Sequence, residues 1–289
     1  MTKPKVAILG LGIMGGGMAS RLLDEQFSIA VFNRSLEKAA ALGQRGAKVC
    51  ASPGEAAAGA DVVISMLADD EGSCDVWLSE EGALGGVHRG ATLIESSTVS
   101  PRWVRQLASA AASRGCDLLD APVTGSKPQA ASGQLLFLVG GAEAALERAR
   151  PVLAALSRDI VHLGPVGSGA LVKLINNFVC GVQVVAIAEA LSLIERTHLN
   201  VEKALSVLTE GAPGSPLVKV LSKRMTSRDF TPNFILKLME KDLKYAMDEA
   251  RTHALTLSTA TAAFHVMRKA DEAGLGDKDF SAVIELLRQ

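Results

Sequence analysis

One lysine and one asparagine stand four residues apart in an otherwise apolar run near the middle of the chain. Lys173 and Asn177 lie within the segment Gly167–Asn177, which reads GSGALVKLINN. Because residues four apart share one face of an α-helix, we expect the two side chains to point the same way. A lysine there can simply extend its ammonium to solvent along its aliphatic stem. In apolar surroundings, however, a lysine is suited to acid/base chemistry, because burial lowers its pKa toward neutrality.

A glycine-rich turn near the N-terminus predicts a dinucleotide site. Val6–Leu9 is typical of a buried strand and is followed directly by Gly10-Leu11-Gly12-Ile13-Met14-Gly15 and then by a helical pattern. Between a strand and a helix, the spacing G-x-G-x-x-G permits a tight turn and close approach of the pyrophosphate to the helix N-terminus. The alternative is a glycine-rich turn that holds no ligand.

The end of the next predicted strand indicates which dinucleotide binds. Enzymes that use NAD normally place an acidic residue there for the ribose hydroxyls, whereas this chain has Asn33, Arg34 and Ser35. Arg34 can hold a 2′-phosphate through charge-assisted hydrogen bonds, and Lys38 follows one turn later. We therefore predict NADP(H), although a guanidinium at this position could also be an ordinary surface charge.

The elements that must position these residues divide the chain into two halves. In the first half, short apolar runs alternate with helical patterns, which predicts a doubly wound parallel sheet of the Rossmann type with helices on both faces. The expected strands are Val6–Leu9, Ile29–Phe32, Val62–Met66, Thr92–Glu95, Asp117–Asp120 and Leu135–Val139. After Pro165 the strand-like runs end and helical periodicity takes over.

The second half is expected to be all-helical. Its first helix should run from about Gly169 to about Thr197, which is longer than the ~10 to 14 residues of an average helix. We interpret this helix as a rigid interdomain connector. The predicted domains are therefore an NADP-binding Rossmann domain, residues 1–165, and a helical substrate and dimerisation domain, residues 166–289.

Composition and charge exclude several classes of protein. Lys plus Arg (30) nearly balance Asp plus Glu (31), so there is no basic surplus for nucleic acid. The N-terminal residues lead straight into the first strand, and we expect no signal peptide. Phe178–Leu193, the longest apolar stretch, is interrupted by Gln183 and Glu189 and is shorter than the ~20 residues of a membrane span. The four cysteines have no metal-ligand spacing, so we expect reduced thiols, no metal and a cytoplasmic protein.

Four motifs in order give the chain a family resemblance. Asp120–Ser126 offers a hydroxyl, a glycine and successive backbone N–H groups, which fits either an anion-binding nest or a simple turn. Together with Gly10–Gly15, Gly167–Asn177 and the later Lys241–Leu243, it resembles the β-hydroxyacid dehydrogenase family over nearly the whole chain. Among the branches of that family, the glyoxylate/succinic semialdehyde reductases look most similar.

The resemblance implies a role for each matching residue. It makes Lys173 the catalytic acid/base and Asn177 a positioner of the substrate and the lysine, and it places Asp242 among the substrate-side residues. We also expect Asp242 to orient the ammonium, although it could merely cap or pair on its own helix. The residues implied to bind substrate are Thr124, Gly125, Phe234 and Lys241, and those implied to contact the cofactor include Met66, Leu67 and Thr98. The family usually has serine in place of Thr124, and β-branching restricts the rotamers of the threonine hydroxyl.

These roles describe an NADPH-dependent reductase of small carboxylate-bearing aldehydes such as glyoxylate and succinic semialdehyde. The alternatives within the family are tartronate semialdehyde reductase and 3-hydroxyisobutyrate dehydrogenase. Imine reduction is less well supported, because the imine-reducing relatives resemble this family without the lysine. A non-catalytic NADP-binding structural protein is the alternative from another class.

A homodimer or homotetramer is also expected. The long helix carries more apolar residues than one small helical domain needs to cover, and a partner subunit would cover the rest. The residues concerned are Val182, Val184, Val185, Ile187, Leu191 and Leu193. The C-terminal helices of the same chain are the alternative cover.

Overall fold

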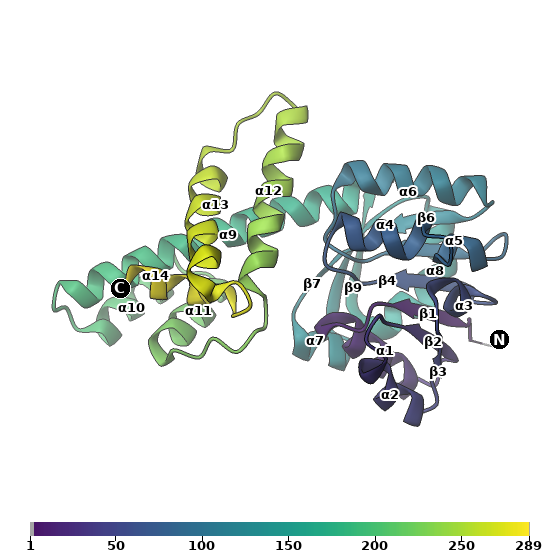
Figure 1. Ribbon diagram of the computed structural model, residues 1–289. Helices are drawn as coiled ribbons and strands as arrows, with labels where there is room; N and C mark the ends of the chain where they lie inside the picture. The colour runs from purple at the N-terminus through teal and green to yellow at the C-terminus, as the bar shows by residue number, and fades with distance from the viewer. Residues whose placement is uncertain (1–2, 289) are drawn as a thin grey trace. The chain divides into compact units, whose positions relative to one another are not determined.

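The computed structural model describes residues 3–288 and divides the chain into two compact units, Met1–Lys173 and Leu174–Gln289 (Figure 1). The division falls inside the long helix α9, Ser168–Arg196, and not at the predicted domain boundary between residues 165 and 166. The predicted extent of this helix differs from the observed one by a single residue at each end. An α9 of 29 residues therefore belongs to both units.

The first unit is built on a nine-stranded sheet in the order β3-β2-β1-β4-β5-β6-β8-β7, with β9 also paired to β8. The strands are β1 Val6–Leu9, β2 Ile29–Phe32, β3 Lys48–Val49, β4 Val62–Ser65, β5 Thr92–Glu95, β6 Asp117–Asp120, β7 Val123–Thr124, β8 Leu135–Gly140 and β9 Ser157–Gly164. All six predicted strands are present, and the strands from β3 to β6 are parallel.

The sheet departs from the prediction at one edge. β8 runs antiparallel to β6 and β7, so the sheet is parallel for most of its width and mixed at the end. β3 and β7 are two residues long and leave no periodic signal, and half of the residues of β9 are exposed, among them Arg158 and Asp159. These three strands lack the apolar run by which a buried strand is recognised.

Alternate residues of the central strands face two separate cores. Val6 and Ile8 of β1 belong to one apolar cluster, and Ala7 and Leu9 belong to the other. The first cluster is covered by α1 Ile13–Asp24, α2 Leu36–Gln44, α7 Lys127–Ser132 and α8 Glu143–Leu156. The second is covered by α3 Pro53–Ala57, α4 Asp70–Leu78, α5 Ala83–Gly86 and α6 Pro101–Ser113. A sheet buried on both faces explains why its strands read as continuous apolar runs.

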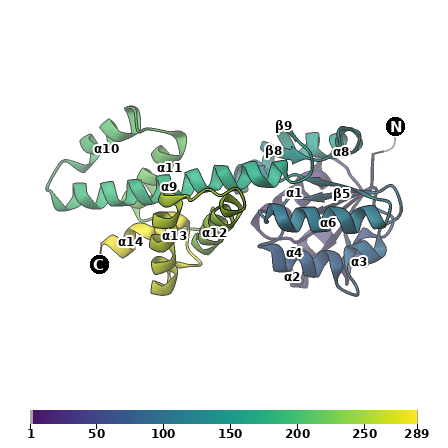
Figure 2. The same ribbon diagram turned by 90° about the horizontal axis from the view of Figure 1, so that it is seen from above.

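Apart from one isolated β-bridge, the regular elements in the described part of the second unit are helices joined by loops. After α9 it comprises α10 Val201–Glu210, α11 Pro216–Ser227, α12 Leu236–Thr252, α13 Ser258–Ala270, a π-turn η1 Asp271–Leu275, a 3₁₀-turn η2 Phe280–Val283 and α14 Ile284–Leu287. Figure 2 shows α10 on one side of α9 and α13 with α14 on the other. Leu191, Met239, Leu243 and Met267 are among the side chains that fill its core.

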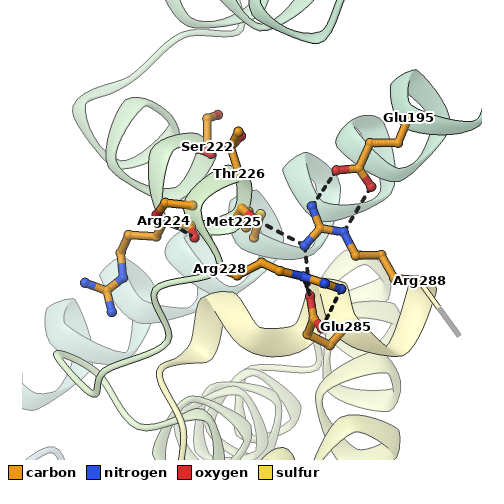
Figure 3. Close-up of polar contacts among 9 residues, drawn as sticks. Glu195, Ser222, Arg224, Met225, Thr226, Arg228, Glu285 and Arg288 are labelled. Carbon is orange, nitrogen blue, oxygen red and sulfur yellow. Dashed lines mark hydrogen bonds and ion pairs between the residues drawn. The ribbon is translucent and has the colours of Figure 1, made fainter. Parts of the chain in front are cut away.

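Arg288 ties the C-terminal end of the described chain to α9 and α11. Its guanidinium donates to both carboxylate oxygens of Glu195, to Glu285 and to the carbonyl of Met225, as Figure 3 shows. A planar guanidinium can make these bonds at once because its donors are arranged in a fixed fork. Arg228 binds the same Glu285 through two further hydrogen bonds.

α9 is long and apolar enough to cross a membrane by length and composition, with a mean hydropathy of 1.8 over its most apolar stretch. Half of that stretch is buried inside the protein. Apolar residues are needed there in any case, because α9 supplies Val184, Ile187 and Leu191 to the core of the second unit.

Candidate active site

The carboxyl ends of five parallel strands lie in register along one edge of the sheet. Leu9 of β1 pairs with Phe32 and with Ser65, Ser65 pairs with Glu95, and Glu95 pairs with Asp120. The loops after these strands therefore emerge side by side. In an open α/β sheet the ligand binds outside this edge, at the point where strand order reverses, which here is between β1 and β4.

The glycine-rich turn packs too closely for side chains. A Cβ on Gly10, whose φ is +95°, would lie 2.4 Å from the carbonyl oxygen of Met66 and 2.8 Å from the side chain of Leu67. A Cβ on Gly15 would lie 2.0 Å from the carbonyl oxygen of Gly10. Gly12, by contrast, faces open space within 4 Å, and no side chain caps the N-terminus of α1 that follows it. The start of α1 thus presents backbone N–H groups without a side-chain cap, which fits a dinucleotide pyrophosphate.

The side chain of Asn33 is hydrogen-bonded to the backbone of the glycine-rich turn and does not simply point to solvent. Its side-chain oxygen accepts a hydrogen bond from the backbone N–H of Leu11, and its amide nitrogen donates to the carbonyl of Ser35, both at 2.9 Å. The spacing of Asn33 alone did not indicate this role. Arg34, Ser35 and Lys38 are exposed at the start of α2, so their polar groups are accessible to a ligand.

The loops after β4 and β5 are fastened to each other. The N–H of Leu67 donates to the Ser97 hydroxyl at 2.7 Å, and the N–H of Ser97 donates to the buried carboxylate of Glu95 at 2.9 Å. Thr98 follows and is half-buried. Glu95 was not among the predicted site residues, although a carboxylate that ends a buried strand was a visible signal.

The Thr124–Gly125 segment forms a sharp turn between β7 and α7. Gly125 has a φ of +117°, in the region that favours glycine, and a Cβ there would lie 3.1 Å from Gln129 and from Leu135. The N–H of Ser126 is occupied, because it donates to the side chain of Gln129 at 3.0 Å. Of the expected anion nest, the half-buried Thr124 hydroxyl and the exposed Gly125 backbone remain as the groups that could meet a carboxylate.

Asp120 fixes the start of the helix that carries Lys173. Its two carboxylate oxygens accept hydrogen bonds of 2.8 Å from the N–H groups of Gly167 and Ala170. Burial raises the pKa of Asp120 from 3.8 to about 6, and these backbone N–H groups oppose that rise by favouring the charged form. We call this contact the Asp120 latch. Its role was not evident from the sequence, where Asp120 was only the first residue of a motif.

Lys173 is half-buried on α9, and Asn177 follows one helical turn later. Within the second unit, Asn177 is 2% exposed and donates its amide to Asp242 at 2.6 Å. Its own side-chain oxygen accepts from Asn176 at 2.9 Å. Asn177 is therefore locked in one orientation by groups on both sides, which suits a positioning role.

Asp242 is bound by residues of its own unit. It is 1% exposed, and besides Asn177 it pairs with the ammonium of Lys241, which lies 2.9 Å from its second carboxylate oxygen. Lys241 also lies over the ring of Tyr245, 4.7 Å from the centroid. Of the two roles considered for Asp242, pairing on its own helix is thus seen directly. The predicted substrate contact Lys241 carries a charge that this carboxylate partly neutralises.

Phe234 is partly buried, and its ring packs on Phe280 with centroids 5.2 Å apart. Asp279 holds the backbone around it by accepting hydrogen bonds from the N–H groups of Asn233 and Phe234. Asp279 itself is 1% exposed and lies 3.4 Å from the guanidinium of Arg224. This anchor was missed, because nothing in the local sequence connects residue 279 to residue 234.

The fold and the glycine turn define a nicotinamide-dinucleotide-binding protein of the Rossmann class. Across residues 3–288, no three His, Cys, Asp or Glu side chains are grouped so as to hold a metal ion. Residues 5–164 match the family model described as the NAD binding domain of 6-phosphogluconate dehydrogenase. Residues 167–287 match the family model described as NAD-binding of NADP-dependent 3-hydroxyisobutyrate dehydrogenase.

Known proteins are similar over the whole length. Glyoxylate/succinic semialdehyde reductase 1 of Arabidopsis thaliana is 36% identical over 98% of each chain. The NAD-dependent L-serine dehydrogenase of Pseudomonas aeruginosa is 34% identical over 98% of this chain and 97% of its own. The structure of 3-hydroxyisobutyrate dehydrogenase from Mycobacterium tuberculosis with L-serine is 35% identical, covers 100% of both chains and superposes with a TM-score of 0.90.

The chain belongs to the β-hydroxyacid dehydrogenase family, as its motifs predicted. It is an oxidoreductase with a nicotinamide dinucleotide as cofactor, and the alternative of a non-catalytic structural protein is set aside. The similar proteins differ in substrate and in cofactor.

Proposed function

We propose that the protein is an NADPH-dependent reductase of small aldehydes that carry a carboxylate, with glyoxylate and succinic semialdehyde as the first candidates. The observation that carries the proposal is the half-buried Lys173, placed one turn before an asparagine whose amide is held by Asp242. The sequence similarity to the Arabidopsis reductase supports the substrate class.

The preference for NADPH rests on Arg34. This exposed guanidinium stands at the end of β2, where a carboxylate would repel a 2′-phosphate, and it makes no ion pair with any of residues 3–288. Arg34 is therefore available for charge-assisted hydrogen bonds to the phosphate. Asn33 contributes indirectly, because it holds the segment that carries Arg34 and Ser35 against the glycine turn.

The chemical step needs a proton donor at the carbonyl oxygen. The bound dinucleotide supplies the hydride that reduces the aldehyde carbon. Lys173 donates a proton to the oxygen as negative charge develops on it, and the ammonium also stabilises that charge electrostatically. Asn177 orients the reacting groups, because its amide has a single fixed position. In the first unit, Thr124 and the Gly125 backbone anchor the substrate carboxylate.

One experiment tests the substrate class and the cofactor together. Turnover is measured for a panel of aldehydes with NADPH and with NADH, in the parent and in Arg34→Asp. The panel contains glyoxylate, succinic semialdehyde, tartronate semialdehyde and uncharged aldehydes of equal length, and the reverse direction includes L-serine and 3-hydroxyisobutyrate. We expect the carboxylate-bearing aldehydes to give the highest kcat/KM.

In cofactor titrations of the same two proteins we expect NADPH to bind to the parent more tightly than NADH by roughly 1.5 to 3 kcal/mol, the contribution of a charged hydrogen bond. Arg34→Asp should reverse that order. Equal affinities in the parent would contradict the role of Arg34. Equal kcat/KM for charged and uncharged aldehydes would contradict carboxylate anchoring, and turnover of L-serine alone would replace the proposed substrate.

A further inference from the structure

The first unit contains a fully buried carboxylate that the proposed reaction does not use. Glu95, at the end of β5, is 0% exposed, and within residues 3–288 no cation is among its partners. One oxygen accepts from the N–H of Ser97 at 2.9 Å. The other accepts from the Ser73 hydroxyl at 2.5 Å and from the indole N–H of Trp77 at 3.0 Å. Burying a carboxylate is costly, and these three donors offset the cost only if each keeps its place.

Both tryptophans of the chain donate into this network. Trp77 binds Glu95 directly and also lies 3.1 Å from the Ser65 hydroxyl. Trp103 donates to Ser73 at 2.8 Å, and Ser73 in turn donates to Glu95. Trp77 comes from α4 and Trp103 from α6, so the carboxylate joins two helices to the sheet. We call Glu95, Ser73, Trp77 and Trp103 the Glu95 network.

The network continues without a break to the glycine turn. Ser97, held by Glu95, accepts a hydrogen bond from the N–H of Leu67 through its hydroxyl at 2.7 Å. The Leu67 side chain packs against Gly10 so closely that a Cβ on Gly10 would come within 2.8 Å of it. The loops after β4 and β5 therefore take their positions from Glu95, and they border the edge of the sheet where the dinucleotide binds.

We propose that Glu95 is a positioning residue for the dinucleotide, and that the two tryptophans report cofactor binding through their contact with it. Glu95 fixes Ser97, Ser97 fixes Leu67, and Leu67 supports the glycine turn. A cofactor that contacts the loops after β4 and β5 changes the hydrogen bonds made by the indoles of Trp77 and Trp103. The proposal rests on dinucleotide binding by this unit and is independent of the choice between NADP and NAD.

The test uses Glu95→Gln in the full chain. An amide has one oxygen and one NH₂ group, so either orientation places a donor against the N–H of Ser97 or of Trp77. We expect the dissociation constant for NADP⁺ to rise about tenfold or more, since hydrogen bonds to a buried charge are lost. We also expect the tryptophan emission of the free protein to change and its response to NADP⁺ to fall. The oxidised form is used because it does not absorb tryptophan emission.

Two further variants separate positioning from stability. Leu84→Ala removes a buried side chain from α5, outside the hydrogen bonds of the Glu95 network, and should destabilise the unit without weakening NADP⁺ binding. Ser97→Ala keeps the backbone contact to Glu95 but removes the acceptor for Leu67. It should leave the emission of the free protein unchanged while weakening binding and reducing the response, and this variant remains informative if Glu95→Gln does not fold.

The outcomes distinguish this proposal from the function on which it rests. Parent-like NADP⁺ affinity in Glu95→Gln, or an equal loss of affinity in Leu84→Ala, would overturn the positioning role. If the tryptophan emission of the parent did not change when NADP⁺ bound, the role of the two tryptophans as reporters of binding would be overturned. A parent that binds neither NADP⁺ nor NAD⁺ would instead overturn the dinucleotide assignment itself.

Discussion

In the proposed reaction, different residues bind the cofactor and transfer the proton. Gly10–Gly15 and Arg34 belong to the loops after β1 and β2, whereas Lys173 stands on α9. Lys173 follows the Asp120 latch by three residues, so the backbone that carries it is fixed by hydrogen bonds unconnected with the glycine turn. The two functions should therefore separate on mutation.

Lys173→Ala is expected to lower kcat by about 10² to 10⁴, the usual contribution of a positioned acid/base group. The dissociation constant for NADPH should stay within a fewfold of the parent. Lys173→Arg should lower kcat as well, because a guanidinium keeps its proton near neutral pH and cannot act as the proton donor. Steady-state kinetics and cofactor titrations measure both quantities, with the exposed Lys269→Ala on α13 as control. Near-normal turnover would refute the mechanism, and lost NADPH binding would make Lys173 a cofactor contact or a structural residue.

At the scale of elements, the Asp120 latch joins β6 to the start of α9 at a position with no spare room. A Cβ on Gly169 would lie 2.2 Å from the carbonyl oxygen of Leu138, and one on Gly140 would lie 2.5 Å from the Asp120 carboxylate. The helix therefore begins directly against the sheet. The backbone N–H groups at the start of a helix need acceptors from outside the helix, and the two carboxylate oxygens of Asp120 are two such acceptors.

The latch predicts a pH dependence of stability. Since burial raises the pKa of Asp120 from 3.8 to about 6, the folded protein binds this proton more tightly than the unfolded chain. The resulting stability is fully present below about pH 4 and is lost as the pH rises through about 6, by roughly 3 kcal/mol in total. Asp120→Asn cannot titrate and should lack this component.

Urea unfolding of the parent and of Asp120→Asn across this range measures the effect as a difference of two curves. The unfolding free energy of the parent, relative to the variant, should fall as the pH rises. Asp117→Asn, at the exposed start of the same strand, removes a carboxylate but keeps the latch and serves as control. Parallel curves for the parent and Asp120→Asn would contradict the assignment.

At the scale of the whole molecule, self-association remains a prediction. Fewer apolar side chains of α9 are exposed than the sequence suggested. Val184, Val185, Ile187 and Leu191 are buried within the second unit itself, as the alternative cover by the same chain anticipated. Leu193 is still 64% exposed on α9. Leu199, Val207 and Val220 are exposed apolar residues of the same unit.

We expect light scattering at micromolar concentration to give the mass of a homodimer or homotetramer. Leu193→Lys should lower that mass, because it places a charge on the exposed apolar side of α9. Leu255→Lys, at a residue 55% exposed between α12 and α13, is the matched control. A parent of monomeric mass would rule out the association.

The sequence by itself determined the features that depend on neighbouring residues. Apolar runs predicted the six buried strands, the glycine turn predicted the dinucleotide site, and a four-residue spacing set Lys173 and Asn177 one turn apart. These features are local because backbone conformation and helix periodicity are properties of a short segment. The family resemblance added roles to these positions.

Only the tertiary structure decided which polar groups meet. Asn177 and Asp242 are 65 residues apart in the sequence, and Asp120 and Gly167 are 47 apart. Glu95, on strand β5, accepts hydrogen bonds from Ser73 and Trp77 of helix α4. The antiparallel pairing of β8 was likewise absent from the local pattern. A buried carboxylate needs donors wherever packing places them, so its partners follow from the arrangement of distant segments and not from sequence spacing.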